Sequence, residues 1–164
     1  MSNKNFEDHV RDVLNGDAQR IALSFAEFLV SNDMMLNLLE GNLWMAGYEG
    51  DGVCYIHLDG AAQHPGPWTV WTEGDYDSEP ESFAIGEHTK ELARAHANIC
   101  GSCGGACSPG KRVTIFGKEI DNVCNAVMEF NNPDDKALEC LKQLVTMRKF
   151  AICEKAKHGG ADEQ

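Results

Sequence analysis

The sequence predicts an α+β protein, in which an antiparallel sheet of about five strands is flanked by N-terminal helices, one middle helix and a long C-terminal helix. Three observations predict this class. Apolar residues recur at helical spacing near both ends of the chain, short strand-like runs bounded by turn residues fill its middle, and no internal repeat or linker divides the 164 residues. We therefore expect a single domain over residues 1–156, followed by a disordered tail over residues 157–164.

The N-terminal third is predicted to be helical. Residues 6–14 and residues 21–29 each place their apolar side chains at the i, i+4, i+7, i+8 spacing of one helix face. Asp33 can cap a third, short helical segment in "MMLNLLE", residues 34–40, and Gly41 would end it.

After Gly41 the pattern changes to that of strands. "NLWMAGY" and "VCYIHL" flank the turn "EGDG" and predict a hairpin, and "WTVWT" predicts a third strand after the turn "HPGP". Residues 87–98 return to helical composition, and "RVTIF" and "VCNAVMEF" are two further strand candidates. Pro133 in "NNPDD" marks the start of the last helix, because proline suits the first helical turn.

The charge of the chain excludes some classes of partner. The formal net charge is −12, which disfavours binding to nucleic acid, since phosphate backbones are bound largely through Lys and Arg. The acidic stretch "TEGDYDSEPESF" is more typical of a solvated loop than of a cation site; its carboxylates are Glu73, Asp75, Asp77, Glu79 and Glu81. No apolar run approaches the length that crosses a bilayer, and the N-terminal residues do not resemble a signal peptide, so we expect a cytoplasmic protein without a membrane partner.

The strongest chemical signal is a cluster of cysteines. Cys100, Cys103 and Cys107 form C-x2-C-x3-C in "CGSCGGACSPG", and Cys124 follows on a predicted strand. A tetrahedral Zn²⁺ takes four Cys or His ligands, and this spacing lets one loop supply three of them, while the loop glycines allow the chain to wrap around a metal. The sequence therefore predicts a structural zinc bound by these four cysteines, with His96 as an alternative ligand.

Other interpretations of the cysteines remain open. An iron–sulfur cluster also requires several thiolates, but the usual run of four closely spaced cysteines is missing. A redox C-x-x-C favours a helix N-terminus, whereas this loop follows a predicted helix. Free thiols in a loop are the third possibility, and no local motif pairs a histidine with a nucleophilic cysteine. Cys54, Cys140 and Cys153 lie beside apolar residues and are predicted to be core residues.

Aromatic residues on the predicted central strands are candidates for a ligand pocket. Trp44, Tyr55, Trp68 and Trp71 could line a site for a flat organic molecule if they share one face of the sheet. The alternative is that they form the core under the helices. Trp68 and Trp71 have opposite parity, so a regular strand directs them to opposite faces. His57 has the parity of Tyr55 and is the candidate for acid–base chemistry.

Two resemblances can be stated from these segments. "FGKEIDNVCNAVMEFNNPDDKALECLKQLVTMRK", together with "VCYIHL", "WTVW" and "CGSCGGACSPGKR", resembles a group of uncharacterised small bacterial proteins that share a CGxCGxxCxPGK loop and an FGKExDNVC segment. This resemblance spans most of residues 43–150 and implies no activity. The order of the predicted elements is similar to that of the YdhG-type frataxin-like family, which implies iron handling by surface carboxylates, although the cysteine loop departs from that plan.

The function expected from the sequence is that of a small, non-enzymatic binding protein with a structural zinc, whose partner is an unidentified small molecule or protein. One alternative is an enzyme acting on a small molecule through His57 or a thiol of the cluster, beside the aromatic residues. The other is a frataxin-like iron-binding chaperone that uses the acidic stretch.

Overall fold

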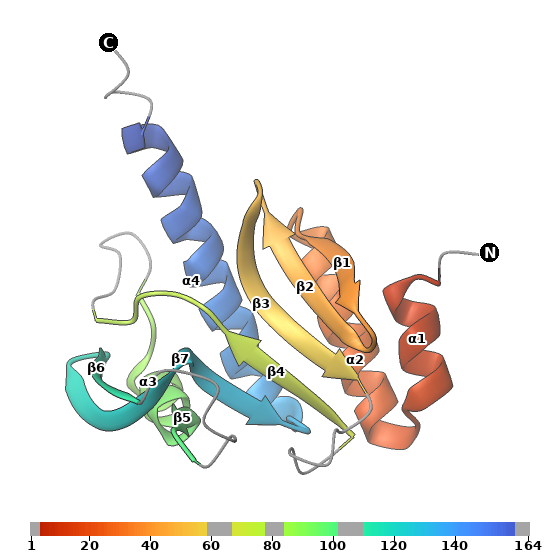
Figure 1. The fold of residues 1–164 in the computed structure, drawn as a ribbon, viewed down its shortest axis with the longest axis horizontal. Coiled ribbons are helices and arrows are strands. Elements are labelled where there is room, and N and C mark those ends of the chain that lie inside the picture. Colours follow the sequence, from red (N-terminus) through yellow and green to blue (C-terminus); the bar gives the residue numbers. More distant parts are fainter. Residues whose placement is uncertain (1–3, 59–66, 78–83, 102–109, 160–164) are drawn as a thin grey trace.

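The computed structural model describes residues 4–58, 67–77, 84–101 and 110–159, and confirms the predicted α+β class. Its helices are α1 (Phe6–Val13), α2 (Gly16–Ser31), α3 (Glu87–Ala95) and α4 (Asp135–Gly159). Its strands are β1 (Met35–Glu40), β2 (Leu43–Tyr48), β3 (Asp51–Leu58), β4 (Trp68–Thr72), β5 (Ala97–Ile99), β6 (Lys111–Ile115) and β7 (Lys118–Asn131). Figure 1 shows α2 and α4 together on one side of the sheet.

The strands form one antiparallel sheet in the order β1-β2-β3-β4-β7-β5, and β6 pairs with β7. The long strand β7 has neighbours on both edges. Met128 pairs with Thr72 of β4 and with Ala97 of β5, so these two strands lie on opposite edges of β7. β1 is the terminal strand at the other end of the order.

The predicted number of about five strands is wrong, because the described residues contain seven. The five predicted strands are present, and the two additional ones were expected to be helical. Residues 34–40 were assigned to a short helix, yet Met35–Glu40 form β1 and pair with β2. The middle helix was expected to reach residue 98, but α3 ends at Ala95 and Ala97–Ile99 form β5. A short apolar run is compatible with a helix or with a strand. In both segments, pairing with a neighbouring strand makes the run a strand.

One face of the sheet forms the core. The register places Trp44, Ile56, Val70 and Phe130 side by side across β2, β3, β4 and β7, and all four side chains are buried. They belong to the same apolar cluster as helix residues such as Phe25 of α2. The helices therefore cover this face because it carries the apolar positions of the strands.

The opposite face carries the alternate residues of the same strands. Met45, Tyr55, Trp71 and Glu129 are adjacent in the register, and each is half-buried. The described helices lie on the other side of the sheet: α1 contacts it through Trp44, and α3 packs against α4. This face is therefore free of helices among the described residues (Figure 1).

Two local predictions about turns and helix ends are confirmed. The β2–β3 hairpin turns at Glu49 and Gly50, whose φ angles of 50° and 88° are those of a type I′ turn. Asp134 accepts a 2.8 Å hydrogen bond from the backbone N–H of Ala137 at the start of α4, just after Pro133.

The end of α4 bears on the predicted tail. The helix continues to Gly159, so residues 157–159 are helical, and residues 160–164 lie outside the described residues. In the part of the chain that the structure describes, no helix combines the length and the apolar character needed to span a bilayer.

Candidate functional site

The structure places two of the four predicted zinc ligands. Cys100 follows the end of β5 directly, and Cys124 lies within β7, and both are half-buried. Cys103 and Cys107 belong to residues 102–109, which lie outside the described residues. The described part of the site therefore consists of Cys100 after β5, where the cysteine loop begins, of β6, before which the loop ends, and of Cys124 in β7.

Both ends of this loop meet β7 at Asn122. On one side, the backbone N–H of Cys100 donates a 2.7 Å hydrogen bond to the carbonyl of Asn122, and the Asn122 side-chain amide donates a 3.0 Å bond back to the carbonyl of Cys100. On the other side, Gly110 lies so close that a Cβ atom there would be 2.7 Å from the carbonyl carbon of Asn122. The two ends are thus held at a residue two positions before Cys124.

The strand pairing shows the same convergence. Val123 pairs with Ile99 of β5 on one edge of β7 and with Lys111 of β6 on the other. Asn122 has a φ of 61°, in the left-handed region that asparagine adopts more readily than most residues. Cys124 therefore follows directly on the point where β5, β7 and β6 meet.

A metal site formed by cysteines would need more thiols than the described residues supply. Among the described residues no group of three or more His, Cys, Asp or Glu side chains is arranged to hold a metal. Two of the four predicted cysteine ligands lie outside those residues, so the described chain supplies only Cys100 and Cys124. The cluster remains a prediction.

His96, the alternative ligand, is engaged elsewhere. Its ring stacks on Phe130 with centroids 4.2 Å apart, and its Nδ1 lies 3.2 Å from the backbone carbonyl of Glu129. These contacts hold the imidazole against β7 five positions beyond Cys124 in the sequence. The described contacts therefore use the imidazole of His96 in packing against β7.

The remaining cysteines are placed differently from those of the cluster. Cys54 on β3 and Cys140 on α4 are buried in the apolar core. Burial raises the pKa of Cys140 to about 12 and raises the pKa of Cys54 as well, because a thiolate is poorly solvated there. Cys153 is half-buried, and its Sγ lies 3.5 Å from the Tyr48 hydroxyl.

We expect Cys54 and Cys140 not to react with iodoacetamide at pH 8 while the protein is folded. The thiolate is the reactive form, and a raised pKa leaves almost none of it at this pH. Peptide mapping by mass spectrometry should find label on Cys153, and on Cys54 and Cys140 only after denaturation. Labelling of Cys54 in the folded protein as fast as Cys153 would contradict this expectation.

The structure separates the four aromatic candidates. Trp44 and Trp68 lie on the helix-covered face and are buried in the core. Tyr55 and Trp71 pair across β3 and β4 on the opposite face. His57 lies on this second face, with its ring 6.3 Å from that of Trp71 in an edge arrangement. Of the four aromatic candidates and His57, only Tyr55, Trp71 and His57 therefore lie on the face away from the helices.

Glu129 joins this second face and is a residue that the sequence did not indicate. The indole Nε1 of Trp71 donates a 2.7 Å hydrogen bond to Oε2 of Glu129, and Nδ2 of Asn131 donates a 2.8 Å bond to Oε1. The hydroxyl of Thr69 in turn donates a 2.8 Å bond to Oδ1 of Asn131. The network fixes the orientation of a carboxylate beside an indole. In the sequence, this network is indicated only by the alternation that places Glu129 and Asn131 on the same face of a strand. That alternation identifies the network only when the pairing of β7 with β4 is known.

The described carboxylates of the acidic stretch accept hydrogen bonds from nearby groups of the protein. Burial raises the pKa of Tyr55, and the nearby Glu73 carboxylate, which accepts its hydrogen bond, raises it further. Asp75 accepts a 2.9 Å bond from the backbone N–H of Asp77, a local turn contact. Glu79 and Glu81 lie outside the described residues. The described carboxylates of this stretch are not gathered into a cation site.

Comparisons with protein-family models, with curated proteins and with solved structures find no match to this chain. The function is inferred below from the contacts of the chain's own residues.

Proposed function

We propose that this chain is a small zinc-binding protein that acts by binding a partner rather than by catalysis. Cys100, Cys103, Cys107 and Cys124 hold one structural Zn²⁺ in this proposal. The observation that carries it is the convergence of both ends of the cysteine loop on Asn122, two positions before Cys124.

Chain connectivity limits how far the loop cysteines can lie from this point. Cys103 is three residues from Cys100, and Cys107 is three residues from Gly110. Three residues span at most about 11 Å when fully extended. The α-carbon of each loop cysteine therefore lies within about 11 Å of Cys100 or Gly110, a limit that is compatible with all four thiols binding one ion.

The ligand set favours a structural role for the zinc. Four protein thiolates fill a tetrahedral site and leave no open position for water or substrate, which a catalytic zinc requires. The metal would join the loop covalently to β7 and so fix the connection between β5 and β6. Because the ligands must be deprotonated, zinc affinity should fall as the pH is lowered.

The test is the metal content of protein purified without added metal. We expect about one zinc per chain by elemental analysis, as a four-thiolate site requires. Cys100→Ser and Cys124→Ser should each lose most of the bound zinc, because serine is a poor zinc ligand. Cys153→Ser is the matched control, since Cys153 lies on α4, and it should keep the wild-type zinc content.

Two results would contradict the proposal. Wild-type protein without metal, with all seven thiols titratable after denaturation, would show that the cysteines are free. A brown protein that contains iron and acid-labile sulfide would replace zinc with an iron–sulfur cluster.

A further inference from the structure

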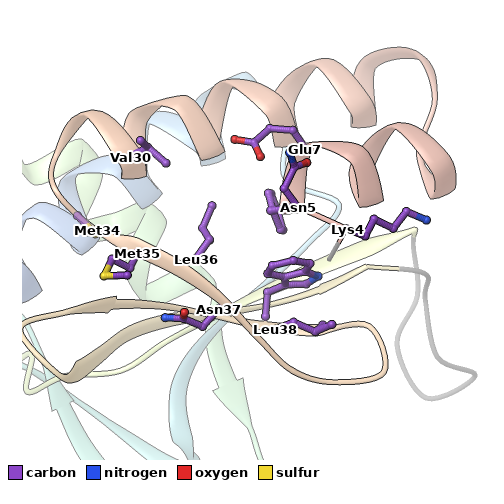
Figure 2. A pocket seen from close by; sticks show the side chains of 11 residues that line it. Lys4, Asn5, Glu7, Val30, Met34, Met35, Leu36, Asn37 and Leu38 are labelled. Atoms are coloured by element: carbon purple, nitrogen blue, oxygen red, sulfur yellow. The ribbon is translucent and has the colours of Figure 1, made fainter. Parts of the chain in front are cut away.

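A groove lies at the opposite end of the sheet from the cysteine cluster, between the start of α1, the end of α2 and the terminal strand β1 (Figure 2). Its volume is about 940 Å³. It is lined by Lys4, Asn5, Phe6, Glu7, Val30, Met34, Met35, Leu36, Asn37, Leu38 and Trp44. Trp44 is fixed within it, because its Nε1 donates a 2.9 Å hydrogen bond to Nδ1 of His9.

The groove coincides with an exposed apolar surface. Val30, Met35 and Leu38 line it with 54%, 67% and 50% of their surface exposed, and Leu39 beside them is 48% exposed. Among the described large hydrophobic residues only Ile99, on β5, is comparably exposed. Contiguous exposed apolar surface of this kind marks sites of interaction.

The groove runs along β1 and reaches its outer edge. Residues 34–38 line it consecutively, although successive side chains of a strand point to opposite faces. Because Trp44 of the helix-covered face lines the groove as well, the groove extends from that face to the outer edge of the strand. Among the described strands β1 pairs with β2 alone, so its outer edge presents backbone N–H and C=O groups to this groove.

We propose that this groove binds an extended peptide segment of a partner protein, which adds to the edge of β1 as a further strand. Alternate apolar side chains of the peptide would pack on Val30, Leu36 and Leu38, while its backbone bonds to β1. The β1–β2 register is regular from Met35 to Leu38 and shifts beyond it, so the added strand is short, about four residues.

The surrounding charge selects a basic peptide. Residues 4–58, which form α1, α2 and the strands β1 to β3, contain nine acidic and three basic residues. Glu7 and Lys4 both line the groove, and Lys4 forms an ion pair with Asp12. Lys or Arg on the peptide would therefore be attracted, whereas a second copy of this chain, with a net charge of −12, and an anionic lipid surface would be repelled.

The proposal is tested with a fluorescently labelled, end-capped peptide KVKVKVK and the full-length protein, by fluorescence anisotropy at low salt. We expect binding that Leu38→Ser or Met35→Ser weakens about tenfold, the effect of losing about 1.4 kcal/mol of contact energy. Ile99→Ser is the matched control, because Ile99 is equally exposed on a distant strand, and it should change the affinity by less than about twofold.

Two further peptides separate strand addition from simple attraction. A version of the same peptide with alternate backbone nitrogens methylated keeps its charge and apolar side chains but cannot donate strand hydrogen bonds, and it should bind at least about tenfold more weakly. The acidic peptide EVEVEVE should not bind. These two controls leave the protein unchanged, so they hold even if a variant folds poorly.

Several outcomes would overturn this inference. It is wrong if KVKVKVK shows no binding at about 1 mM, if the methylated peptide binds equally well, or if Ile99→Ser weakens binding as much as Leu38→Ser. A concentration-dependent dimer that Leu38→Ser dissociates would show that a second copy of the chain occupies the groove instead. The peptide comparisons do not depend on the zinc proposal, since β1 and the strands near Cys100 and Cys124 lie at opposite ends of the sheet.

Discussion

Replacing Trp68 by alanine is expected to lower the free energy of unfolding by about 3–5 kcal/mol, the range for removing a buried tryptophan or phenylalanine ring. Trp68 is completely buried on β4, pairs with Leu58 of β3 and belongs to the core cluster under the helices. The alanine variant would leave a cavity that the surrounding strands and helices can fill only partly.

Two comparisons make this prediction specific to the core. The indole Nε1 of Trp68 is buried and has no hydrogen-bond acceptor among the described residues, so Trp68→Phe removes an unsatisfied donor and should cost much less than Trp68→Ala. Trp71→Ala, on the half-exposed face, should also lower the free energy of unfolding by less than Trp68→Ala does, although it breaks the hydrogen bond to Glu129. Urea denaturation gives the free energy of unfolding of all three variants. If Trp68→Ala were the mildest of the three, Trp68 would belong to a ligand pocket rather than to the core.

Replacing Gly110 by alanine is expected to destabilise the protein by about 1–3 kcal/mol, as overpacking does, and to speed zinc loss to a chelator. A Cβ atom at this position would lie 2.7 Å from the carbonyl carbon and 2.8 Å from the carbonyl oxygen of Asn122. These are backbone atoms of a paired strand, so they cannot move aside as the end of a flexible side chain would. The loop end must therefore shift away from β7.

Gly101 supplies the control at the other end of the same loop. A Cβ atom there would meet nothing within 4 Å, so Gly101→Ala should leave both stability and zinc release close to wild type. The measurements are thermal unfolding and the rate of zinc transfer to a colorimetric chelator. Equal effects of the two substitutions would mean that the close approach of Gly110 to Asn122 does not position the cysteine loop.

Much of the fold could be predicted from local patterns. The helical spacing in residues 6–14 and 21–29 and the glycine turn after Tyr48 all predicted elements that the structure contains. Pro133 likewise marked the start of α4. Each of these signals depends on a few neighbouring residues, such as a cap, a turn residue or one turn of apolar positions. For that reason they could be recognised without knowledge of the tertiary structure.

The assignment of residues 34–40 failed for the complementary reason. Leucine and methionine in this segment are compatible with a helix, and only pairing with Leu43–Tyr48 makes the segment a strand. The groove along β1 is a consequence of the same pairing, so no inspection of the sequence would have found it.

The sequence by itself determined the α+β class, the positions of β2, β3, β4, β6 and β7, and the cysteine spacing on which the zinc proposal rests. Each of these is a property of neighbouring residues. The tertiary structure decided which residues meet. It brought Asn122 to both ends of the cysteine loop, placed Trp71 opposite Glu129 on the face away from Trp68, and left β1 as the terminal strand. These outcomes depend on which distant segments pair and in what register, and a shift of one residue in register would move every side chain of a strand to the other face.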